Sequence, residues 1–177
     1  RRFDRYWVDD TQLAQGLGRL PADLVLHATH PSVAARHELR LPFVSALTLV
    51  GCDELESRTK GYGDIAVAVR RYAHHGTIRR DTRELFARMV FNILMDNTDD
   101  HERNHSLRLG LDGYYELTPA YDVVPTLQNL GYQAMAVGLA GAESSLENAL
   151  TELREFGIQR ARAVELIQQV ARVVHGW

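Results

Sequence analysis

The sequence predicts a mainly helical α+β domain that contains one small β-hairpin. Apolar residues recur at helical spacing in several stretches, and two short strand-like runs flank a single turn signal. The length of 177 residues is enough to bury one core and is short for two. We therefore expect a single domain over residues 1–177.

The composition is typical of a globular protein, with 45% apolar and 24% charged residues. A net charge of −3 gives no general electrostatic reason to bind nucleic acid or an anionic membrane. Cys52 has no partner for an internal disulfide, and no apolar run approaches the roughly 18 residues of a membrane helix. These features predict a reduced, cytoplasmic protein without membrane contact. The chain opens on Arg1 in the phrase "RRFDRYW", which suggests a piece of a longer protein.

The first third of the chain gives weak signals. Residues 11–41 show no sustained period and are predicted to be loop and short strand. Pro42 suits the first turn of a helix that ends at Gly51. The apolar face of this helix would carry Phe43, Ala46, Leu47 and Val50. A second predicted helix carries Ile65, Val69 and Tyr72.

The strongest helical signal begins at Asp81, where Glu84 stands three residues later as in a capping box. The apolar positions that follow predict a buried central helix. They are Leu85, Phe86, Met89, Val90, Ile93 and Leu94. This helix runs into the polar stretch "NTDDHERN" at 97–104.

A hairpin and two further helices are predicted beyond the polar stretch. The runs "SLRL" and "YYEL" flank "GLDG", whose Asp-Gly pair is a turn signal. Ser144 and Glu147 indicate a helix start, and Gly157 indicates its end. The buried side of this helix would hold Leu146, Leu150, Leu153 and Phe156. A last helix should run from about Gln159 towards His175.

The polar stretch and the segment after the hairpin carry the residue types of a phosphoryl-transfer site. Asp99 precedes Asn104 by five positions, as a proton-accepting Asp precedes a Mg²⁺-binding Asn in protein kinases. Asp122 follows the predicted hairpin, where a second metal-binding Asp is needed. The order Asp, Asn, hairpin, Asp is more specific than any of its parts.

A purely structural alternative is that these side chains hydrogen-bond to local backbone groups at a turn. Under the phosphoryl-transfer hypothesis, Asp96, Asp100 and Glu102 are expected to be solvated or capping residues, because that mechanism does not need them. His105 is expected to be structural.

A metal-dependent hydrolase is a second alternative. Its ligands would come from Asp99, Asp100, His101, His105, His74 and His75. No H-E-x-x-H or cysteine-based zinc spacing supports it, and His74 and His75 follow a predicted helix end, where histidines favour terminal carbonyls.

Three phrases together resemble the C-terminal lobe of HipA-type toxin kinases, which are bacterial Ser/Thr protein kinases of toxin–antitoxin systems. They are "RFDR" at 2–5, "FNILMDNTDDHERNHSL" at 91–107 and "LTPAYDVVP" at 117–125. The resemblance implies a protein-kinase-like lobe that begins at the hinge between two lobes. The N-terminal lobe, with its glycine-rich loop and lysine, would lie upstream, so this piece alone should bind nucleotide poorly and transfer no phosphate.

The resemblance also implies roles for individual residues. Asp99 would be the catalytic base, and Asn104 and Asp122 would hold Mg²⁺ against ATP. The residues that would contact ATP are Arg1, Arg2, Phe3, His101, Glu102, Arg103, Asn104, Tyr121 and Asp122. The family hinge usually reads Glu-Arg-Phe-Asp-Arg, and here Arg1 replaces the Glu.

Family members usually work beside a helix-turn-helix antitoxin that binds operator DNA, so we expect DNA contact only through that partner. The substrate would be a cytosolic protein, which for some members resembles an aminoacyl-tRNA synthetase, and its phosphorylation would inhibit growth. A catalytically silent kinase fold that docks an antitoxin stays open, as do the hydrolase and a kinase for small molecules or lipids.

Overall fold

The computed structural model describes residues 42–52, 60–110, 112–126 and 128–176. The chain divides into two units, and nearly all described residues lie in the second, Phe43–Trp177. Arg1, Arg2 and Phe3, which the resemblance places at the hinge, lie outside the described residues.

A three-stranded antiparallel sheet has the order β1-β2-β3. The predicted hairpin is confirmed as β2 (Ser106–Leu109) and β3 (Tyr115–Leu117). The helix predicted from Pro42 is wrong in its first half, because β1 (Phe43–Ser45) pairs with β2 before the short helix α3 (Ala46–Leu49) begins. The backbone groups of Phe43–Ser45 find partners on the hairpin edge, which overrides the local helical pattern.

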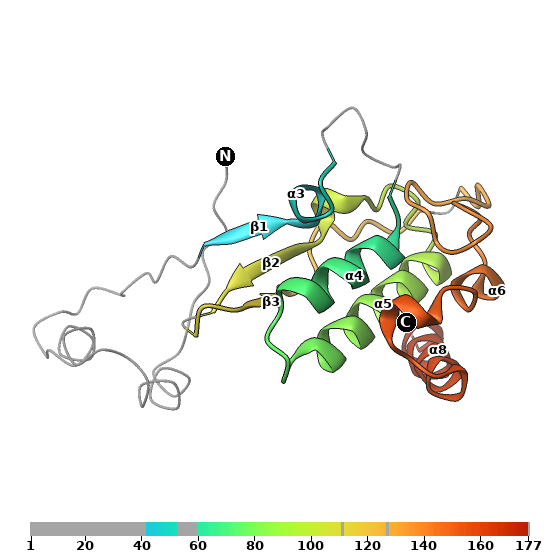
Figure 1. The fold of residues 1–177 in the computed structure, drawn as a ribbon. Coiled ribbons are helices and arrows are strands. Elements are labelled where there is room, and N and C mark those ends of the chain that lie inside the picture. Colours follow the sequence, from blue (N-terminus) through green and yellow to red (C-terminus); the bar gives the residue numbers. More distant parts are fainter. Residues whose placement is uncertain (1–41, 53–59, 111, 127, 177) are drawn as a thin grey trace, which may run out of the picture. The chain divides into compact units, whose positions relative to one another are not determined.

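Three longer helices build the core beside this sheet (Figure 1). They are α4 (Tyr62–Tyr72), α5 (Ile78–Leu94) and α8 (Arg160–His175). Helix α5 packs against both α4 and α8, and it is the buried central helix that the sequence predicts. Phe86, Met89 and Val90 are fully buried, while Ile93 and Leu94 are partly buried against the same core.

Helix α5 begins earlier than predicted, at Ile78 after Thr77. Asp81 therefore does not cap it. Its carboxylate is buried and accepts hydrogen bonds from the backbone amide of Leu117 (3.1 Å) and from Nε of Arg80 (2.7 Å). Because Leu117 lies on β3, Asp81 joins the central helix to the hairpin.

The single helix predicted from Ser144 is two short helices, α6 (Leu146–Ala149) and α7 (Leu153–Phe156). Ser145, not Ser144, caps α6 by accepting the backbone amide of Asn148 at 3.1 Å. Gly157 ends α7 with a φ of 64°, as its sequence position predicts. The last helix is confirmed as α8.

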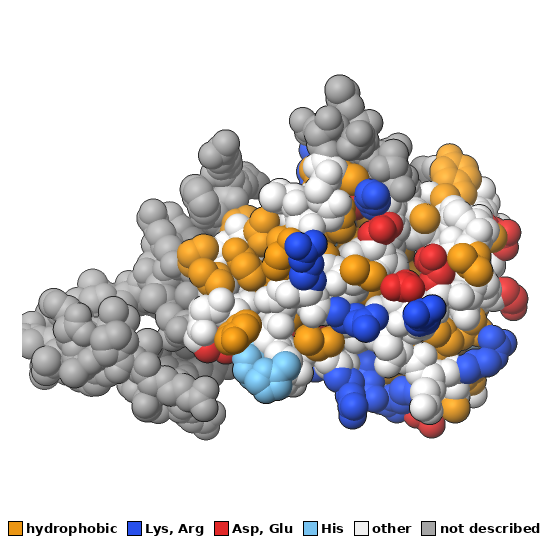
Figure 2. Space-filling view, viewed as in Figure 1, with side chains coloured by type: hydrophobic (Ala, Val, Ile, Leu, Met, Phe, Trp, Pro, Cys, Tyr) orange, Lys and Arg blue, Asp and Glu red, His pale blue; other side chains and the backbone are white. Residues whose placement is uncertain are grey.

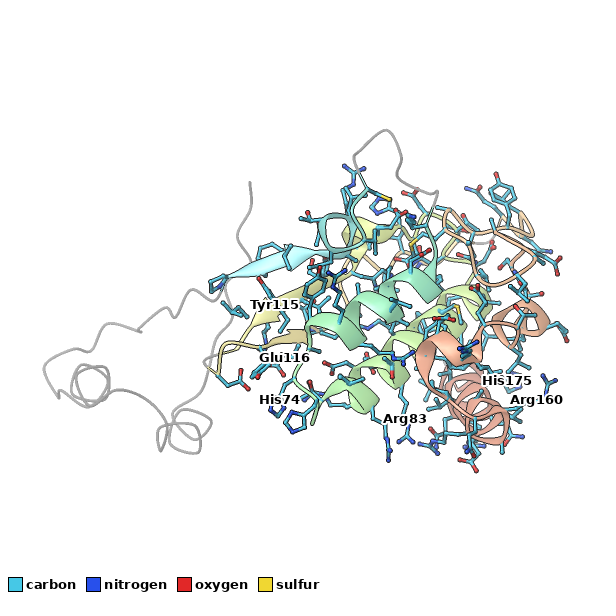
Figure 3. The ribbon with its side chains drawn as sticks, in the orientation of Figure 1. His74, Arg83, Tyr115, Glu116, Arg160 and His175 are labelled. Atoms are coloured by element: carbon cyan, nitrogen blue, oxygen red, sulfur yellow. The ribbon has the colours of Figure 1, made fainter. Side chains whose placement is uncertain are left out.

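Charged side chains of both signs share the face seen in Figure 2. Arg83 on α5 and Arg160 at the start of α8 lie on this face (Figure 3). Glu116 on β3 accepts hydrogen bonds from Arg80 (2.9 Å) and Arg108 (2.8 Å), which again joins α5 to the hairpin. Among the described residues, no helix has the length and apolar character to cross a membrane.

Candidate active site

The polar stretch lies in a loop, residues 95–105, that leads from α5 to β2; we call it the polar loop. Asp96, with a φ of 53°, reverses the chain after α5. The backbone amide of Asn97 then returns to the carbonyl of Asn92 at 2.9 Å. The loop closes with one turn of 3₁₀ helix, η2 (Glu102–Asn104). Both ends of the loop are therefore held by the core elements.

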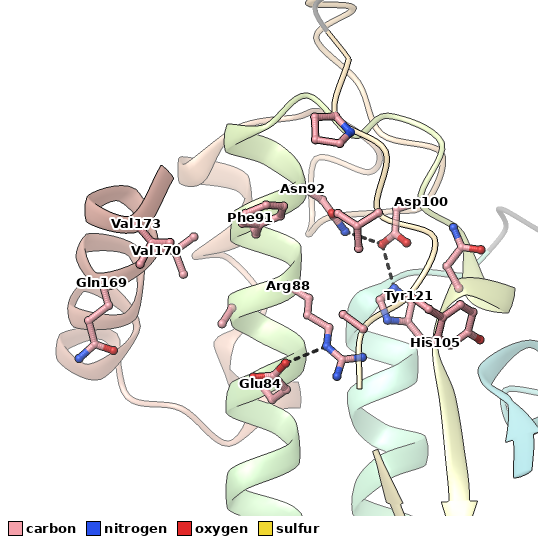
Figure 4. Close-up of a pocket in the computed structure, with 15 residues that line it drawn as sticks. Glu84, Arg88, Phe91, Asn92, Asp100, His105, Tyr121, Gln169, Val170 and Val173 are labelled. Atoms are coloured by element: carbon pink, nitrogen blue, oxygen red, sulfur yellow. Dashed lines mark hydrogen bonds and ion pairs between the residues drawn. The ribbon is translucent and has the colours of Figure 1, made fainter. Parts of the chain in front are cut away.

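Asp100 is the centre of a buried hydrogen-bond network. Its side chain is 4% exposed, and its Oδ2 accepts from Nδ2 of Asn92 (2.8 Å) and meets Nε2 of His105 at 2.8 Å (Figure 4). The hydroxyl of Tyr62 on α4 donates to the same oxygen. Asn97 extends the network by donating to Oδ1 of Asn92 at 3.0 Å. The expectation that Asp100 is a solvated or capping residue is therefore wrong.

This network holds the pKa of Asp100 below its ordinary value. Burial alone would raise that pKa, but hydrogen bonds from His105, Tyr62 and Asn104, together with the charge interaction with His105, outweigh it. Burial, followed by the nearby Asp100 charge, raises the pKa of Tyr62. Asp100 is thus ionised near neutral pH, so it can only accept hydrogen bonds, and we assign the donor at 2.8 Å to Nε2–H of His105.

Asp99, the predicted base, is exposed, although the next residue is one of the most buried polar groups of the domain. Asn104, the predicted metal ligand, is 6% exposed, and its backbone amide donates to the carbonyl of His101 at 2.8 Å. His101 is partly buried and Arg103 is exposed. Glu102, expected to be solvated or capping, is fully buried.

Tyr121 connects the polar loop with the segment of residues 118–126, which we call the Asp122 segment. The Tyr121 hydroxyl donates to the carbonyl of Arg103 at 2.6 Å. Because that hydrogen is already used, the Ser106 hydroxyl, 2.6 Å away, donates to the Tyr121 oxygen. The structure therefore brings Tyr121 to the predicted ATP-contacting loop. Asp122 follows it, exposed and with a φ of 55°.

A cavity of about 580 Å³ lies between α5, α8, the polar loop and the Asp122 segment (Figure 4). Its lining includes Asn104 and Tyr121 but neither Asp99 nor Asp122. Arg88 of α5 also lines it and donates to the carbonyl of Thr118 at 2.5 Å. The two acidic residues with predicted catalytic or metal roles therefore lie outside the cavity.

Sequence reasoning missed Tyr62, Arg88 and Asn92 as site residues. Each lies on a helix and is buried, and each contacts the polar loop or the Asp122 segment. A signal for two of them was present, because Arg88 and Asn92 interrupt the apolar run of the central helix. Such polar residues at buried helical positions need partners, and here the loops supply them.

The six possible ligands of the hydrolase hypothesis do not gather. Among the described residues, no three His, Cys, Asp or Glu side chains lie together so that they could hold a metal ion. His74 instead accepts the backbone amide of Gly76 at 3.1 Å, and its ring packs at a tilt against His75 and edge-on against Tyr114. His105 is structural, as expected, through its bond to Asp100.

Comparison with solved structures gives a neighbour of the same fold. The HipA chain in a complex of HipA, HipB and operator DNA from Shewanella oneidensis MR-1 matches with a TM-score of 0.64 and 16% identity. The match covers 82% of this chain and 38% of that chain. No curated protein matches the sequence.

The family comparison agrees with the resemblance drawn from the three motif phrases. The family model of the HipA-like C-terminal domain matches residues 1–177. The match therefore includes the polar loop, the hairpin and the Asp122 segment. The chain belongs to the family of HipA-like C-terminal domains.

Proposed function

We propose that the protein containing this domain is an ATP- and Mg²⁺-dependent serine/threonine protein kinase of a bacterial toxin–antitoxin system. The observation that carries the proposal is the division of roles between two adjacent carboxylates. Asp100 is buried and used by the fold, whereas Asp99 is exposed at the surface of the same loop. A general base must reach the proton it accepts, and exposure of Asp99 meets that requirement.

In the proposed reaction Asp99 accepts the proton of the attacking serine or threonine hydroxyl. The hydroxyl oxygen forms a bond to the γ-phosphorus of ATP, and the bond from that phosphorus to the bridging oxygen of ADP breaks. Asp99 would also orient the hydroxyl for this displacement. The side chains of this domain need to perform little further covalent chemistry, because such reactions depend mainly on positioning and charge stabilisation.

Asn104 and Asp122 would hold Mg²⁺. Their side chains offer an amide oxygen and a carboxylate, the hard oxygen donors that this ion prefers. The fit is supported by Asp122, which is exposed in a left-handed backbone conformation, and by Tyr121, which binds the backbone next to Asn104. Bound Mg²⁺ would neutralise charge on the phosphates.

The ATP contacts would come from His101, Glu102, Arg103, Asn104, Tyr121 and Asp122, with Arg1, Arg2 and Phe3 at the hinge. Glu102 is fully buried, so any contribution from it would be made through its backbone or its effect on η2. The chain spans 38% of the Shewanella HipA chain, so we propose this activity for the whole protein. We expect the domain alone to bind nucleotide poorly.

A helix-turn-helix antitoxin is the proposed partner, because the Shewanella relative was solved with HipB and operator DNA. DNA would be reached through that antitoxin. The proposed substrate is a cytosolic protein whose phosphorylation inhibits growth, with aminoacyl-tRNA synthetases as the first class to test.

The experiment is transfer of labelled γ-phosphate from ATP by the whole protein, with and without Mg²⁺, to itself and to proteins of a bacterial lysate. We expect labelling that requires Mg²⁺ and that falls at least about a thousandfold in Asp99→Asn. Asp112→Asn is the matched control, because Asp112 lies in the exposed hairpin turn and accepts the amide of Tyr114.

The outcomes separate the candidate functions. Labelling that survives in Asp99→Asn would remove Asp99 as the base. A whole protein that binds ATP but transfers no phosphate under any condition would favour the catalytically silent docking module. Phosphate transfer to a small molecule or lipid, and to no protein, would change the substrate class.

A further inference from the structure

The two residues that follow Asp99 and Asn104 are bonded to each other. Asp100 comes directly after Asp99, and His105 comes directly after Asn104. Oδ2 of Asp100 and Nε2 of His105 are 2.8 Å apart, and both side chains are at most 4% exposed. This bond therefore joins the loop at the two points next to its predicted functional residues.

Each end of the bond is also fixed to the core. Asp100 accepts hydrogen bonds from Asn92 on α5 and from Tyr62 on α4. The carbonyl of His105 accepts the backbone amide of Ala46 at 2.7 Å, and its ring meets that of Tyr62 edge-on at 5.6 Å. Movement of Asp100 would thus break its contacts with α4 and α5, and movement of His105 would break its contacts with Ala46 of α3 and Tyr62 of α4.

We propose that Asp100 and His105 are positioning residues whose hydrogen bond sets the separation between the Asp99 carboxylate and the Asn104 amide. The inference rests on the proposed kinase function. In this arrangement neither Asp100 nor His105 touches the substrate. They act by holding the base and the metal ligand in one geometry, which matters because small displacements of such groups cost large factors in rate.

Asp100 also orients the side chain of Asn104. The Asn104 side chain hydrogen-bonds to the Asp100 carboxylate. An ionised carboxylate can only accept, so the amide nitrogen of Asn104 is the donor. With the nitrogen directed to Asp100, the amide oxygen is the atom left to bind a metal. This is the usual relation between a metal ligand and the residue that orients it.

A pair of His105 variants tests the role of the bond. Glutamine can place a donor near the position of Nε2, and Nδ1 of His105 has no hydrogen-bond partner among the described residues, so His105→Gln should keep the bond. His105→Leu fills similar space but cannot donate. The matched control is Asp81→Asn, because Asp81 is another buried carboxylate, 2% exposed, that serves the hairpin and not the polar loop.

The whole protein is measured in two ways. Affinity for Mn²⁺ in the presence of the non-hydrolysable β,γ-imido analogue of ATP is read from the electron paramagnetic resonance of free Mn²⁺. Phosphate transfer gives kcat and KM for ATP, and thermal melting reports stability. We expect His105→Leu to weaken Mn²⁺ binding and lower kcat by about tenfold or more each. His105→Gln should stay within about threefold of the parent.

Asp81→Asn should melt at a lower temperature yet keep the parent's Mn²⁺ affinity. The proposal is overturned if His105→Leu binds Mn²⁺ like the parent, or if Asp81→Asn loses as much affinity for an equal fall in melting temperature. A parent that binds Mn²⁺ and nucleotide but transfers no phosphate defeats the kinase function, while the Mn²⁺ affinities still decide the role of the bond. A parent that binds no Mn²⁺ overturns both.

Discussion

The polar loop and the Asp122 segment hold the proposed functional residues in different ways. In the loop, Asp100 and Asn97 are buried and bonded to helices α4 and α5, and buried His105 is bonded to Asp100 and to Ala46 of α3. In the segment, residues 119–120 and 122–125 are exposed, with Val124 reaching 59%. The domain's own fold therefore fixes Asp99 and Asn104, whereas Asp122 is held by few contacts.

Among the described residues, most hydrogen bonds that link the Asp122 segment to the rest of the domain are made with the polar loop. Tyr121 donates to the carbonyl of Arg103, and Thr126 donates to the carbonyl of Asp96 at 2.6 Å. Asp96, expected to be solvated or capping, is partly buried, and its carboxylate accepts the backbone amide of Asn129 at 2.5 Å, so its side chain holds a segment 33 residues later and not local backbone. The position of the segment therefore depends on the loop more than the loop depends on the segment.

The largest expected effect on stability comes from Asp100→Ala. This change leaves the hydroxyl of Tyr62 and the donors of Asn92 and His105 without their acceptor. Loss of a buried charged acceptor should lower the free energy of unfolding by about 3 kcal/mol or more, as measured by urea denaturation. Asp112→Ala, in the exposed turn, should cost less than about 0.5 kcal/mol. Equal losses in the two variants would mean that the loop network contributes little.

Tyr121→Phe should have a smaller effect that is concentrated in the Asp122 segment. It removes the hydroxyl between Arg103 and Ser106, a net loss of about 1 kcal/mol for a partly exposed group. Hydrogen exchange should speed up in residues 118–126 and stay slow in the polar loop. Tyr114→Phe, whose residue is 50% exposed on the hairpin, is the matched control. Faster exchange throughout the loop would show that the loop depends on the segment after all.

The smallest effect is predicted at Glu152, a carboxylate whose raised pKa owes nothing to a hydrogen-bond donor among the described residues. Burial, followed by the charges of Asp64 and Glu155, raises the pKa of Glu152 above 4.5. A raised pKa in the folded state means that the ionised form disfavours folding, so Glu152 costs stability as pH rises through its ordinary and folded pKa values.

Glu152→Gln should therefore stabilise the protein at pH 7, by up to about 0.5 kcal/mol, and make no difference below pH 4. Urea denaturation at the two pH values measures the change. Glu147→Gln, at an exposed position in the first turn of α6, is the control. A gain that persists unchanged at low pH would assign the effect to packing instead of charge.

Local patterns predicted the elements whose signals lie within one stretch of chain. The central helix, the hairpin, the last helix and the glycine end at Gly157 were found from period and turn chemistry alone. Strand β1 was missed because its backbone partners lie on β2, some 60 residues later. The break between α6 and α7 was missed because Leu150 and Leu153 continue the helical apolar pattern across it.

The site shows the same limit. The spacing of Asp99 and Asn104 could be read from the sequence, and exposure of Asp99 agrees with its proposed role. The buried states of Asp100 and Glu102 could not be predicted, because a carboxylate is expected to be solvated, and the partners of Asp100 lie on separate elements, α4 and α5. The hinge residues Arg1, Arg2 and Phe3 stay predictions.

The backbone of Asp122 limits which residues could replace it if the proposed Mg²⁺ site were lost. With a φ of 55°, the position accepts Gly, Asn or Asp with little strain, and resists β-branched or bulky residues. A relative that keeps the fold but lacks the proposed Mg²⁺ site should therefore carry Asn or Gly at this position. A valine there would instead indicate that the local backbone conformation has changed. The residue type at this one position would therefore distinguish loss of the metal ligand on an unchanged backbone from a change in the backbone itself.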